Sequence, residues 1–493
     1  MASGKENIVL FPFMAQGHIL PFLSLAQLIE QKENHTVNLI STPLNIKKIK
    51  QSLPPTSSIS LLEIPFNSSE HGLPPNSENT DALPPPLFLQ FLMTSHSFKH
   101  AFRELISTLV QDQGRPPLCI IADIFFPWTA EIAREFGSFN AIFSGAGGYG
   151  LACYHSLWSN LPKMGEIPDE FSLPGFPEGA VIRADQIPEN LRFATVTDSW
   201  AVFQQKVFNE WLDSDGLLIN TVEDFDHLGL KSLREQLNLP VWPIGPVHSL
   251  IGHKARGGKE SSTKWEIIEE WLDNKPSGSV LYISFGSQSK ISASQMMHLA
   301  LALESTGKNF IWIVRPPVEC DISSEFKADE WLPEGFEERM VRQNKGLLVS
   351  EWAPQLNILS HRATSTFLSH CGWNSVMESL SNAVPLIAWP LIADQHFNAK
   401  MLEEEVGVCV QVATDTNCGI RQQDLQEKIE LVMEETEKGM DMRRKARKVK
   451  KTIENAIRSD TGLEGSSVKA LDAFLLAAGL KKEGNIKEYG NGF

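Results

Sequence analysis

The chain has 493 residues, enough for two or three domains at about 150 residues each. Hydrophobic residues make up 42% of it and charged residues 21%, which excludes disordered, collagen-like and disulfide-scaffold proteins. Lys and Arg number 44 against 60 Asp and Glu, a net charge of -16, which argues against a general nucleic-acid-binding protein. An anionic ligand would therefore need a locally favourable site.

The first 242 residues predict an α/β domain. Short β-branched or leucine-rich runs alternate with helical stretches, the pattern typical of a parallel sheet covered by helices. The apolar run near the start is short and is interrupted by Pro12, so we expect a strand there and not a signal peptide. The predicted strands are residues 8–11, 37–41, 59–64, 118–122, 140–143 and 217–220.

A second series of strands follows a segment rich in Pro, Gly, Ser and charge, which predicts a linker over residues 243–264. These strands are residues 280–285, 310–315, 347–349, 366–368 and 386–389, with a crossover helix over 293–305. The expected order is thus an N-terminal Rossmann-like domain (1–242), the linker, a second Rossmann-like domain (265–455), a helix packing back on the first domain (456–480), and a flexible tail (481–493).

The most specific motif spans residues 352–395 and reads WAPQLNILSHRATSTFLSHCGWNSVMESLSNAVPLIAWPLIADQ. Within it a strand should end at Leu368, and Asn374 and Ser375 should open a helix. Free amides at a helix start attract phosphate. The sequence therefore predicts a pyrophosphate cradle formed by His370, Asn374 and Ser375.

This segment closely resembles the signature box of the plant family 1 UDP-dependent glycosyltransferases. FPFMAQGHILPFLSLA near the start and WLDNKPSGSVLYISFGS in the middle are similar to the same family. The resemblance implies the α/β GT-B fold, in which two Rossmann-like, doubly wound parallel-sheet domains face each other across a cleft. It also implies inverting transfer of a sugar, with no cofactor besides UDP-glucose as co-substrate.

The resemblance further assigns the UDP-sugar site. It implies that Trp352 stacks on uracil, that Gln355 and Glu378 hold the base and ribose, and that a final Gln395 suits glucose, whereas His there is associated with galactose. Taken singly, Trp352 could instead be a core aromatic and Glu378 a solvated helix position. The implied donor-binding residues are Ser287, Trp352, Ala353, Gln355, His370, Trp373, Asn374, Ser375, Glu378, Asp394 and Gln395, with Ser144 as a further contact to the sugar.

One residue departs from the family pattern. Ala383 stands where the family usually has glycine, just after the predicted helix that carries Glu378. A left-handed helix cap at Ala383 would cost on the order of 1 kcal/mol. Asn382 could take the cap instead.

His18 should lie in the turn after the first strand, at the mouth of the cleft between the sheets. From position alone, a structural histidine is the alternative. The resemblance makes His18 the general base, and Asp123, at the end of a predicted strand, the acid that orients it. A carboxylate bonded to one ring nitrogen fixes the tautomer and stabilises the imidazolium formed when the other nitrogen takes a proton.

No metal site is expected, although two DxD pairs occur, Asp213 with Asp215 and Asp224 with Asp226. The first pair comes just before a predicted strand, and the second lies at a predicted helix start, where acids suit the helix dipole. The basic run over residues 443–451 is interpreted as a solvated helix face, with phosphate binding as the minor alternative.

The acceptor is expected in the N-terminal domain, where aromatic residues could form its pocket or simply the core. The candidates are Phe13, Met14, Phe88, Phe91, Phe126, Tyr149 and Trp158. The sequence thus predicts a monomeric glucosyltransferase, without nucleic-acid partner or membrane span, acting on a hydroxyl of a small lipophilic phenolic, flavonoid or terpenoid. Six cysteines without a CxxC pair favour a cytoplasmic location. A non-catalytic UDP-sugar binder and a nucleotide-sugar isomerase or hydrolase are the alternatives.

Overall fold

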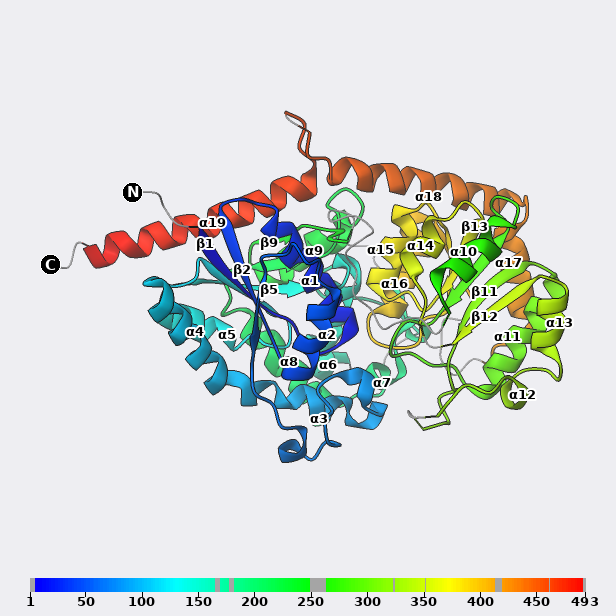
Figure 1. Ribbon diagram of the computed structural model, residues 1–493, viewed down its shortest axis with the longest axis horizontal. Helices are drawn as coiled ribbons and strands as arrows, with labels where there is room; N and C mark the ends of the chain where they lie inside the picture. Colours follow the sequence, from blue (N-terminus) through cyan, green and yellow to red (C-terminus); the bar gives the residue numbers. More distant parts are fainter. Residues whose placement is uncertain are drawn as a thin grey trace.

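The computed structural model describes residues 5–164, 169–176, 181–248, 263–321, 324–350, 352–412, 419–460 and 462–490. Two α/β halves lie side by side, the first in blue to green and the second in green to orange (Figure 1). Each half is built on a parallel sheet, so the predicted α/β class with two parallel sheets is confirmed. In the described ranges, no helix combines the length and the hydropathy needed to cross a bilayer.

The first sheet has the strand order β3-β2-β1-β4-β5-β8-β9, and every neighbouring pair is parallel. The order reverses between β1 and β4, and at such a switch point the loops after the strands diverge and leave room for a ligand. The strands are β1 (Glu6–Phe11), β2 (His35–Ser41), β3 (Ser60–Glu63), β4 (Cys119–Asp123), β5 (Phe139–Ser144), β8 (Leu217–Ile219) and β9 (Val241–Pro243).

The second sheet has the parallel order β12-β11-β10-β13-β14-β15, with its switch point between β10 and β13. Its central strands are fully buried, as expected when helices cover both faces of a parallel sheet. The strands are β10 (Val280–Ser284), β11 (Asn309–Val314), β12 (Gly346–Ser350), β13 (Thr364–Ser369), β14 (Leu386–Ala388) and β15 (Cys409–Gln411). A separate antiparallel hairpin pairs β6 (Glu170–Ser172) with β7 (Val181–Arg183).

Helices connect the strands within each domain. Those of the first domain are α1 (Gln16–Glu30), α2 (Pro43–Ser52), α3 (Phe88–Met93), α4 (Lys99–Gln113), α5 (Thr129–Phe136), α6 (Gly148–Met164), α7 (Glu189–Arg192), α8 (Ser199–Trp211) and α9 (His227–Leu237). Those that follow are α10 (Trp265–Asp273), α11 (Ala293–Thr306), α12 (Ala328–Trp331), α13 (Phe336–Arg342), α14 (Gln355–Ser360), α15 (Trp373–Ser381), α16 (Gln395–Lys400), α17 (Gln422–Met433), α18 (Glu437–Ala456) and α19 (Ser466–Gly490).

The last two helices run along one edge of the molecule and cross from the second domain back to the first (Figure 1). On α19, Phe474 is fully buried, with its ring centroid 5.8 Å from that of Phe139 and 5.4 Å from that of Trp242. The C-terminal helix thus completes the core of the first domain.

The end of this helix differs from the prediction. A flexible tail was expected from residue 481, but α19 continues to Gly490. Lys481 lies 2.6 Å from the Asp215 carboxylate and Lys482 lies 2.7 Å from Glu6. These ion pairs, which join residues far apart in sequence, hold the start of the expected tail on the first domain.

The predicted linker also begins too early. Residue 243 belongs to β9, and Ile244 and Val247 are buried in the same core as β9. The proline and glycine content suggested a linker, whereas the apolar residues between them pack into the first domain. Residues 249–262 of the predicted linker lie outside the described residues.

Candidate active site

His18 and Asp123 meet at the switch point of the first sheet. His18 lies in the first turn of α1, just after β1, and Asp123 is the last residue of β4. Since β1 and β4 are parallel neighbours, their carboxyl ends lie side by side. The Nδ1 atom of His18 lies 2.8 Å from Oδ2 of Asp123.

The environment of this pair suits a general base. Burial disfavours the charged imidazole, but the charge of Asp123 and its hydrogen bond outweigh this effect, so the pKa of His18 lies above its usual value. The Asp123 side chain is 1% exposed, whereas that of His18 is 28% exposed. With Nδ1 directed at Asp123, the Nε2 atom is the one left to accept a proton from a substrate.

Aromatic rings surround the base on the first-domain side. Phe13 and Phe125 each have their ring centroid 5.5 Å from that of His18, and Phe91 lies 5.5 Å from Phe13. Phe125 continues this wall toward Phe203, 6.2 Å away. Sequence reasoning included Phe13 and Phe91 but missed Phe125, although its position two residues after Asp123 was an available signal.

The other predicted acceptor residues are not in ring contact with His18, although Phe126 packs 6.0 Å from Phe13. Phe126 is stacked inside the core, 4.4 Å from Phe11. On α6, Trp158 is fully buried and Tyr149 packs edge-on against Phe176. Met14 is buried after β1, and Phe88 is half-buried at the start of α3. The structure therefore places Phe126 and Trp158 in the core.

The residues predicted to form the pyrophosphate cradle lie at the switch point of the second sheet. The loop after β10, with Gly286 and the exposed Ser287, faces the loop after β13, with His370 and Gly372. A Cβ atom at either glycine would lie 2.5 Å from Nε2 of His370, so glycine lets both loops close on the imidazole. Ser375 lies in the first turn of α15, where backbone amides are free to bind an anion.

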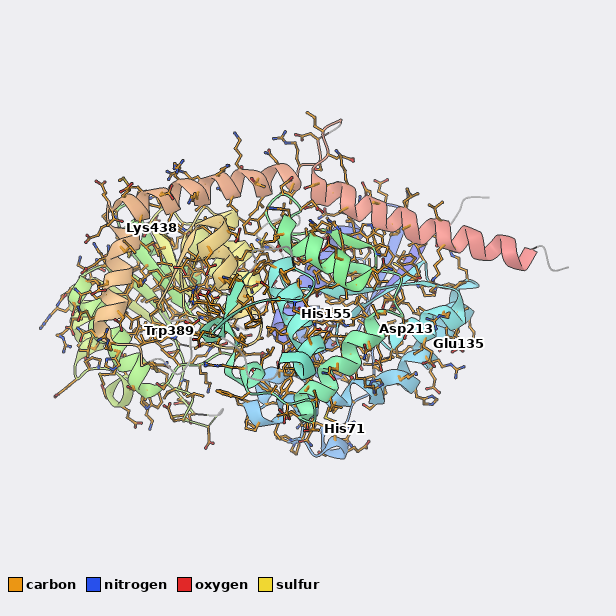
Figure 2. The ribbon with its side chains drawn as sticks, turned by 180° about the vertical axis from the view of Figure 1, so that it is seen from behind. His71, Glu135, His155, Asp213, Trp389 and Lys438 are labelled. Atoms are coloured by element: carbon orange, nitrogen blue, oxygen red, sulfur yellow. The ribbon has the colours of Figure 1, made fainter. Side chains whose placement is uncertain are left out.

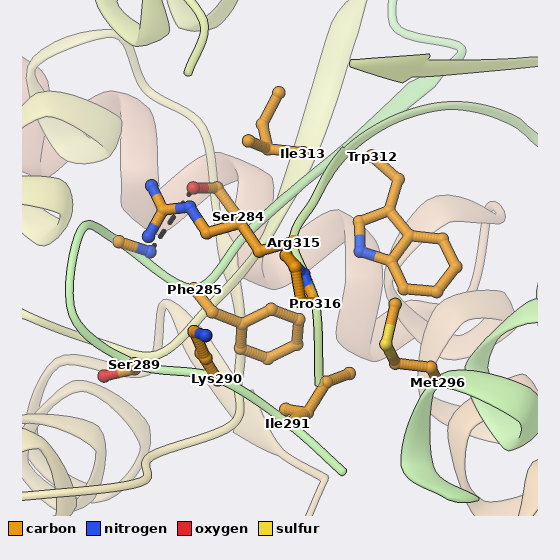
Figure 3. A pocket seen from close by; sticks show the side chains of 11 residues that line it. Ser284, Phe285, Ser289, Lys290, Ile291, Met296, Trp312, Ile313, Arg315 and Pro316 are labelled. Carbon is orange, nitrogen blue, oxygen red and sulfur yellow. Dashed lines mark hydrogen bonds between the residues drawn. The ribbon is translucent and has the colours of Figure 1, made fainter. Parts of the chain in front are cut away.

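Two basic residues missed by sequence reasoning add positive charge at this end of the sheet. Lys290 and Arg315, with Ser284 and Gly286, line a small pocket between the ends of β10 and β11 (Figure 3). Burial and the charge of Arg315 lower the pKa of His370 to about 4. His370 is therefore neutral at pH 7 and can donate one N–H to a phosphate. A basic residue at the end of the predicted strand 310–315 was the available signal for Arg315.

The residues assigned to the base and ribose form one hydrogen-bonded network. Nε2 of Gln355, at the start of α14, donates to Glu378 at 2.8 Å and to the Ser375 hydroxyl at 3.0 Å. The Tyr282 hydroxyl donates to Oε1 of Gln355 at 3.2 Å. Glu378 is buried on α15. It is therefore not a solvated helix position, which was the alternative interpretation of the sequence.

Trp352 and Ala353 precede this network. Trp352 is half-buried and Ala353 is buried. The Ala353 carbonyl accepts a hydrogen bond from the backbone N–H of Gln355 at 2.8 Å. A half-buried indole keeps ring area available for stacking, which a core aromatic would not.

The predicted sugar-binding residues face the base across the domains. Asp394 is half-buried and lies close enough to His18 that each influences the pKa of the other. Asn398 donates to the Asp394 carboxylate at 2.9 Å. Oε1 of Gln395 accepts from the N–H groups of Leu391 and Ile392, both at 3.0 Å. The Gln395 oxygen is therefore used within the protein, and its NH2 group remains for a ligand.

Trp373 and Ser144 are held by contacts within the protein. The indole N–H of Trp373 donates to the Asn220 carbonyl at 2.7 Å, and the ring packs on Gly147. The indole is thus engaged by the first domain. Ser144 is buried at the end of β5, where its hydroxyl accepts from the N–H of Ala146 at 3.2 Å.

Three residues other than glycine around the donor site have left-handed backbones. Cys371 has φ 61°, Ala383 has φ 59° and Ala393 has φ 54°. Ala383 itself therefore takes the left-handed conformation, whereas Asn382, with φ -104°, does not. Strained residues of this kind cluster at functional sites, where the surrounding structure holds them.

Both DxD pairs have structural partners. Asp215 accepts from the Asn140 N–H at 2.8 Å besides pairing with Lys481, and Asp213, labelled in the first domain in Figure 2, lies 3.7 Å from the Arg134 guanidinium. Asp226 lies just before α9, but its carboxylate accepts from the N–H groups that open α6. In the described ranges, no group of three His, Cys, Asp or Glu could hold a metal ion.

The basic run on α18 makes structural contacts. Arg443 donates to the carbonyls of Val432 and Glu434 at the end of α17, and Arg444 and Lys445 pair with Asp441. The rest of the run includes exposed side chains. These contacts agree with a solvated helix face.

Two facing α/β domains with loops gathered at both switch points define the GT-B class of glycosyltransferases. The family model described as "UDP-glucoronosyl and UDP-glucosyl transferase" matches residues 202–446. UDP-glycosyltransferase 92A1 of Arabidopsis thaliana is 46% identical over 98% of this chain and 100% of its own. Crocetin glucosyltransferase 3 of Crocus sativus is 41% identical over 89% of this chain and 92% of its own.

A solved structure agrees with these relatives. The crystal structure of Glycyrrhiza uralensis UGT73P12, complexed with glycyrrhetinic acid 3-O-monoglucuronide, is similar with a TM-score of 0.83, 25% identity and 98% coverage of both chains. The chain belongs to the plant family 1 UDP-glycosyltransferases. It is an enzyme that uses a UDP-sugar.

Proposed function

We propose that this enzyme transfers glucose from UDP-glucose to a hydroxyl of a small lipophilic plant metabolite, with inversion, and releases a β-glucoside. The observation that carries the proposal is His18, oriented by Asp123 at 2.8 Å, in a loop whose Gly17 carbonyl accepts a hydrogen bond at 2.9 Å from Asn374 of the opposite domain. The charge of Asp394, also of that domain, is felt by His18. A base from one domain and a sugar-binding carboxylate from the other are what direct transfer between two bound substrates requires.

The proposed reaction is a single displacement. Nε2 of His18 takes the proton of the acceptor hydroxyl while the acceptor oxygen attacks the anomeric carbon. The bond from that carbon to the UDP oxygen breaks, and UDP leaves with the bonding electrons. Attack opposite the leaving group inverts the anomeric centre. The amides that open α15 and the N–H of His370 would stabilise the charge on UDP.

Glucose as the donor sugar is supported by the residues at the start of α16. The Asp394 carboxylate can accept from two sugar hydroxyls, and the remaining NH2 group of Gln395 can donate to a third. The Crocus relative is itself named a glucosyltransferase.

A lipophilic acceptor is supported by the wall of phenylalanines around His18. Phe125 is half-buried beside His18, and the buried rings of Phe13 and Phe91 pack next to it or to each other as an apolar backing. Such a surface favours phenolics, flavonoids or terpenoids over polar acceptors. We also propose that the enzyme is a cytoplasmic monomer that needs no cofactor.

Incubation with UDP-glucose and a panel of plant phenolics and terpenoids tests the proposal. A product heavier than an acceptor by one hexose is the expected result, with the β configuration seen by NMR. UDP released without acceptor would indicate a hydrolase, an altered sugar nucleotide an isomerase, and binding without any product a UDP-sugar binder. Each of these outcomes would contradict the proposal.

A further inference from the structure

Asn220 joins three separate parts of the molecule. It follows β8 and is 1% exposed. Its Oδ1 atom accepts from the N–H of Val247 at 3.0 Å, and its Nδ2 atom donates to Oδ1 of Asn374 at 3.3 Å. Its carbonyl accepts from the indole N–H of Trp373 at 2.7 Å. One buried residue of the first sheet thus binds the chain after β9 and the start of α15.

The contacts continue from α15 to the loop that carries the base. Nδ2 of Asn374 donates to the carbonyl of Gly17 at 2.9 Å, and Gly17 directly precedes His18. Both ends of the Asn374 amide are therefore bound by the first domain, in addition to the phosphate role expected for this residue. The Asn374 side chain therefore links Asn220 to the Gly17 carbonyl, so a displacement of Asn220 would also displace this carbonyl.

The chain leaves the first domain after β9 and returns to it at α19, and both of these segments lie beside Asn220. Gly245 packs so closely that a Cβ atom there would lie 2.4 Å from the carbonyl carbon of Asn220. The Gly245 carbonyl accepts a hydrogen bond from the Ser467 hydroxyl at the start of α19. The chain after β9 and the C-terminal helix are thus both fixed beside Asn220. Both connections between the domains are therefore held beside the same buried residue.

We propose that Asn220 is a positioning residue for glycosyl transfer, which holds the donor-binding start of α15 in register with the loop of His18. The inference rests on the proposed function for the role of His18. It assigns to Asn220 no contact with either substrate. Its effect is to set where the base stands relative to the bound UDP-sugar as the domains close.

Another contact between the domains provides a matched control. Nε2 of Gln186 donates to Oε1 of Glu404 at 2.9 Å. This bond also joins the first domain to the second, but neither residue bonds to the loops around His18 or to α15. Loss of this bond tests for a general weakening of the interface.

The experiment compares Asn220→Ala, Asn220→Asp and Gln186→Ala in the full chain. The Asp variant keeps the size of the side chain and the acceptor for Val247, but it replaces the donor to Asn374 with an oxygen. The measurements are kcat, KM for UDP-glucose, the Kd of UDP by calorimetry and the midpoint of thermal unfolding. A fourth measurement is the hydrogen exchange of the peptide containing Gly17 and His18, with and without UDP.

Both Asn220 variants should lower kcat at least about fivefold, the effect of losing roughly one hydrogen bond, with the Kd of UDP within about twofold of the wild type. UDP should slow exchange of the Gly17 peptide in the wild type and in Gln186→Ala but not in the Asn220 variants. Unchanged kcat, or UDP affinity lost in proportion to kcat, would overturn the inference. If the Ala variant fails to fold, the Asp variant decides.

The exchange measurement also separates this inference from the proposed function. If the wild-type protein transfers no glucose, but UDP slows exchange of its Gly17 peptide and not that of the Asn220 variants, only the proposed reaction is refuted. If the enzyme transfers glucose, but UDP slows exchange of the Gly17 peptide equally in the wild type and in the Asn220 variants, only the positioning role of Asn220 is refuted.

Discussion

At the scale of single residues, the reaction depends on the protonation of His18. The neutral imidazole is the form that takes a proton, and Asp123 lies 2.8 Å from the nitrogen that must keep its own. The same carboxylate raises the pKa of His18, against the effect of burial. Asp123 therefore makes the base stronger and at the same time raises the pH below which the base is lost.

Replacing the base should remove most of the activity. His18→Ala is expected to lower turnover by about 10²-fold or more, the usual contribution of a general base. UDP should bind with unchanged affinity because its proposed site lies in the other domain. His100→Ala serves as a control, since the side chain of His100 is 83% exposed. Turnover retained without His18 would refute its assignment as the base.

The pH profile should move when the orienting carboxylate is neutralised. In the wild type, kcat/KM falls as the pH drops through the raised pKa of His18. In Asp123→Asn the favourable charge is gone while burial remains, so this fall should occur at lower pH. The plateau rate should also be lower, with acidic phenols least affected because they need less help to lose a proton. If kcat/KM falls at the same pH in Asp123→Asn as in the wild type, this result would count against the role of Asp123.

Donor choice should depend on Gln395. The native enzyme is expected to prefer UDP-glucose to UDP-galactose by at least about tenfold, within the range of one satisfied polar contact. Gln395→His should narrow this ratio, chiefly by losing glucose activity, because the amide that binds the N–H groups of Leu391 and Ile392 is lost. Competition between the two donors measures the ratio, with the substitution Gln423→His at an exposed position of α17 as control. An unchanged ratio would show that other residues select the sugar.

At the scale of elements, short strand-to-helix loops place the donor-binding groups. The loops after β10 and β13 close around His370 through two glycines, and α15 ends in a left-handed residue that is not glycine. Left-handed residues other than glycine therefore flank both ends of α15, Cys371 before its start and Ala383 after its end. The sequence indicated this departure but not which neighbouring residue would adopt the strained backbone.

Relief of this strain should stabilise the fold. Ala383→Gly is expected to raise the free energy of unfolding by about 1 kcal/mol, because glycine adopts a positive φ without steric cost. Denaturant unfolding measures the change. Ala473→Gly is the control, since Ala473 is exposed within α19 and glycine in a helix interior should cost roughly 0.5–1 kcal/mol. A lower free energy of unfolding for Ala383→Gly would show that packing of the Ala383 methyl group stabilises the fold by more than the strained backbone destabilises it.

At the scale of the whole molecule, the two domains supply different parts of one site. The first domain holds the proposed base and the phenylalanines around it, and the second holds the proposed pyrophosphate cradle at the start of α15. The helix α19 returns to the first domain, so the chain crosses between the domains twice. Lys438 and Trp389 lie in one half, and Glu135 and His155 in the other (Figure 2).

Fixed charges and dipoles of the assembled site should make a metal ion unnecessary. The proposed leaving-group site offers helix amides and an imidazole N–H, and Asp215 and Asp226 are engaged in structural contacts. Activity is therefore expected to survive excess chelator. Loss of turnover with chelator, and recovery on addition of Mg²⁺ or Mn²⁺, would require a metal role for other acidic residues.

The sequence by itself determined most of the fold and the donor-site residues. Long apolar runs such as β1 and β10 are buried on both faces, and such runs predict parallel strands with little ambiguity. The three-residue strands β6, β7, β9 and β15 were missed because so few residues carry no readable period. The equally short β8 and β14 were predicted from their apolar runs LLI and LIA. The compact motif 352–395 specified the cradle, since its residues lie on consecutive loops and helices of one domain.

Only the tertiary structure decided which distant residues meet. His18 and Asp123 are 105 positions apart, and their pairing follows from the parallel neighbours β1 and β4. Phe125 and Asn220 acquire their roles from neighbours on other elements, which no local pattern encodes. Periodicity and motifs report the local conformation of the chain, whereas packing between the domains determines which side chains share a site.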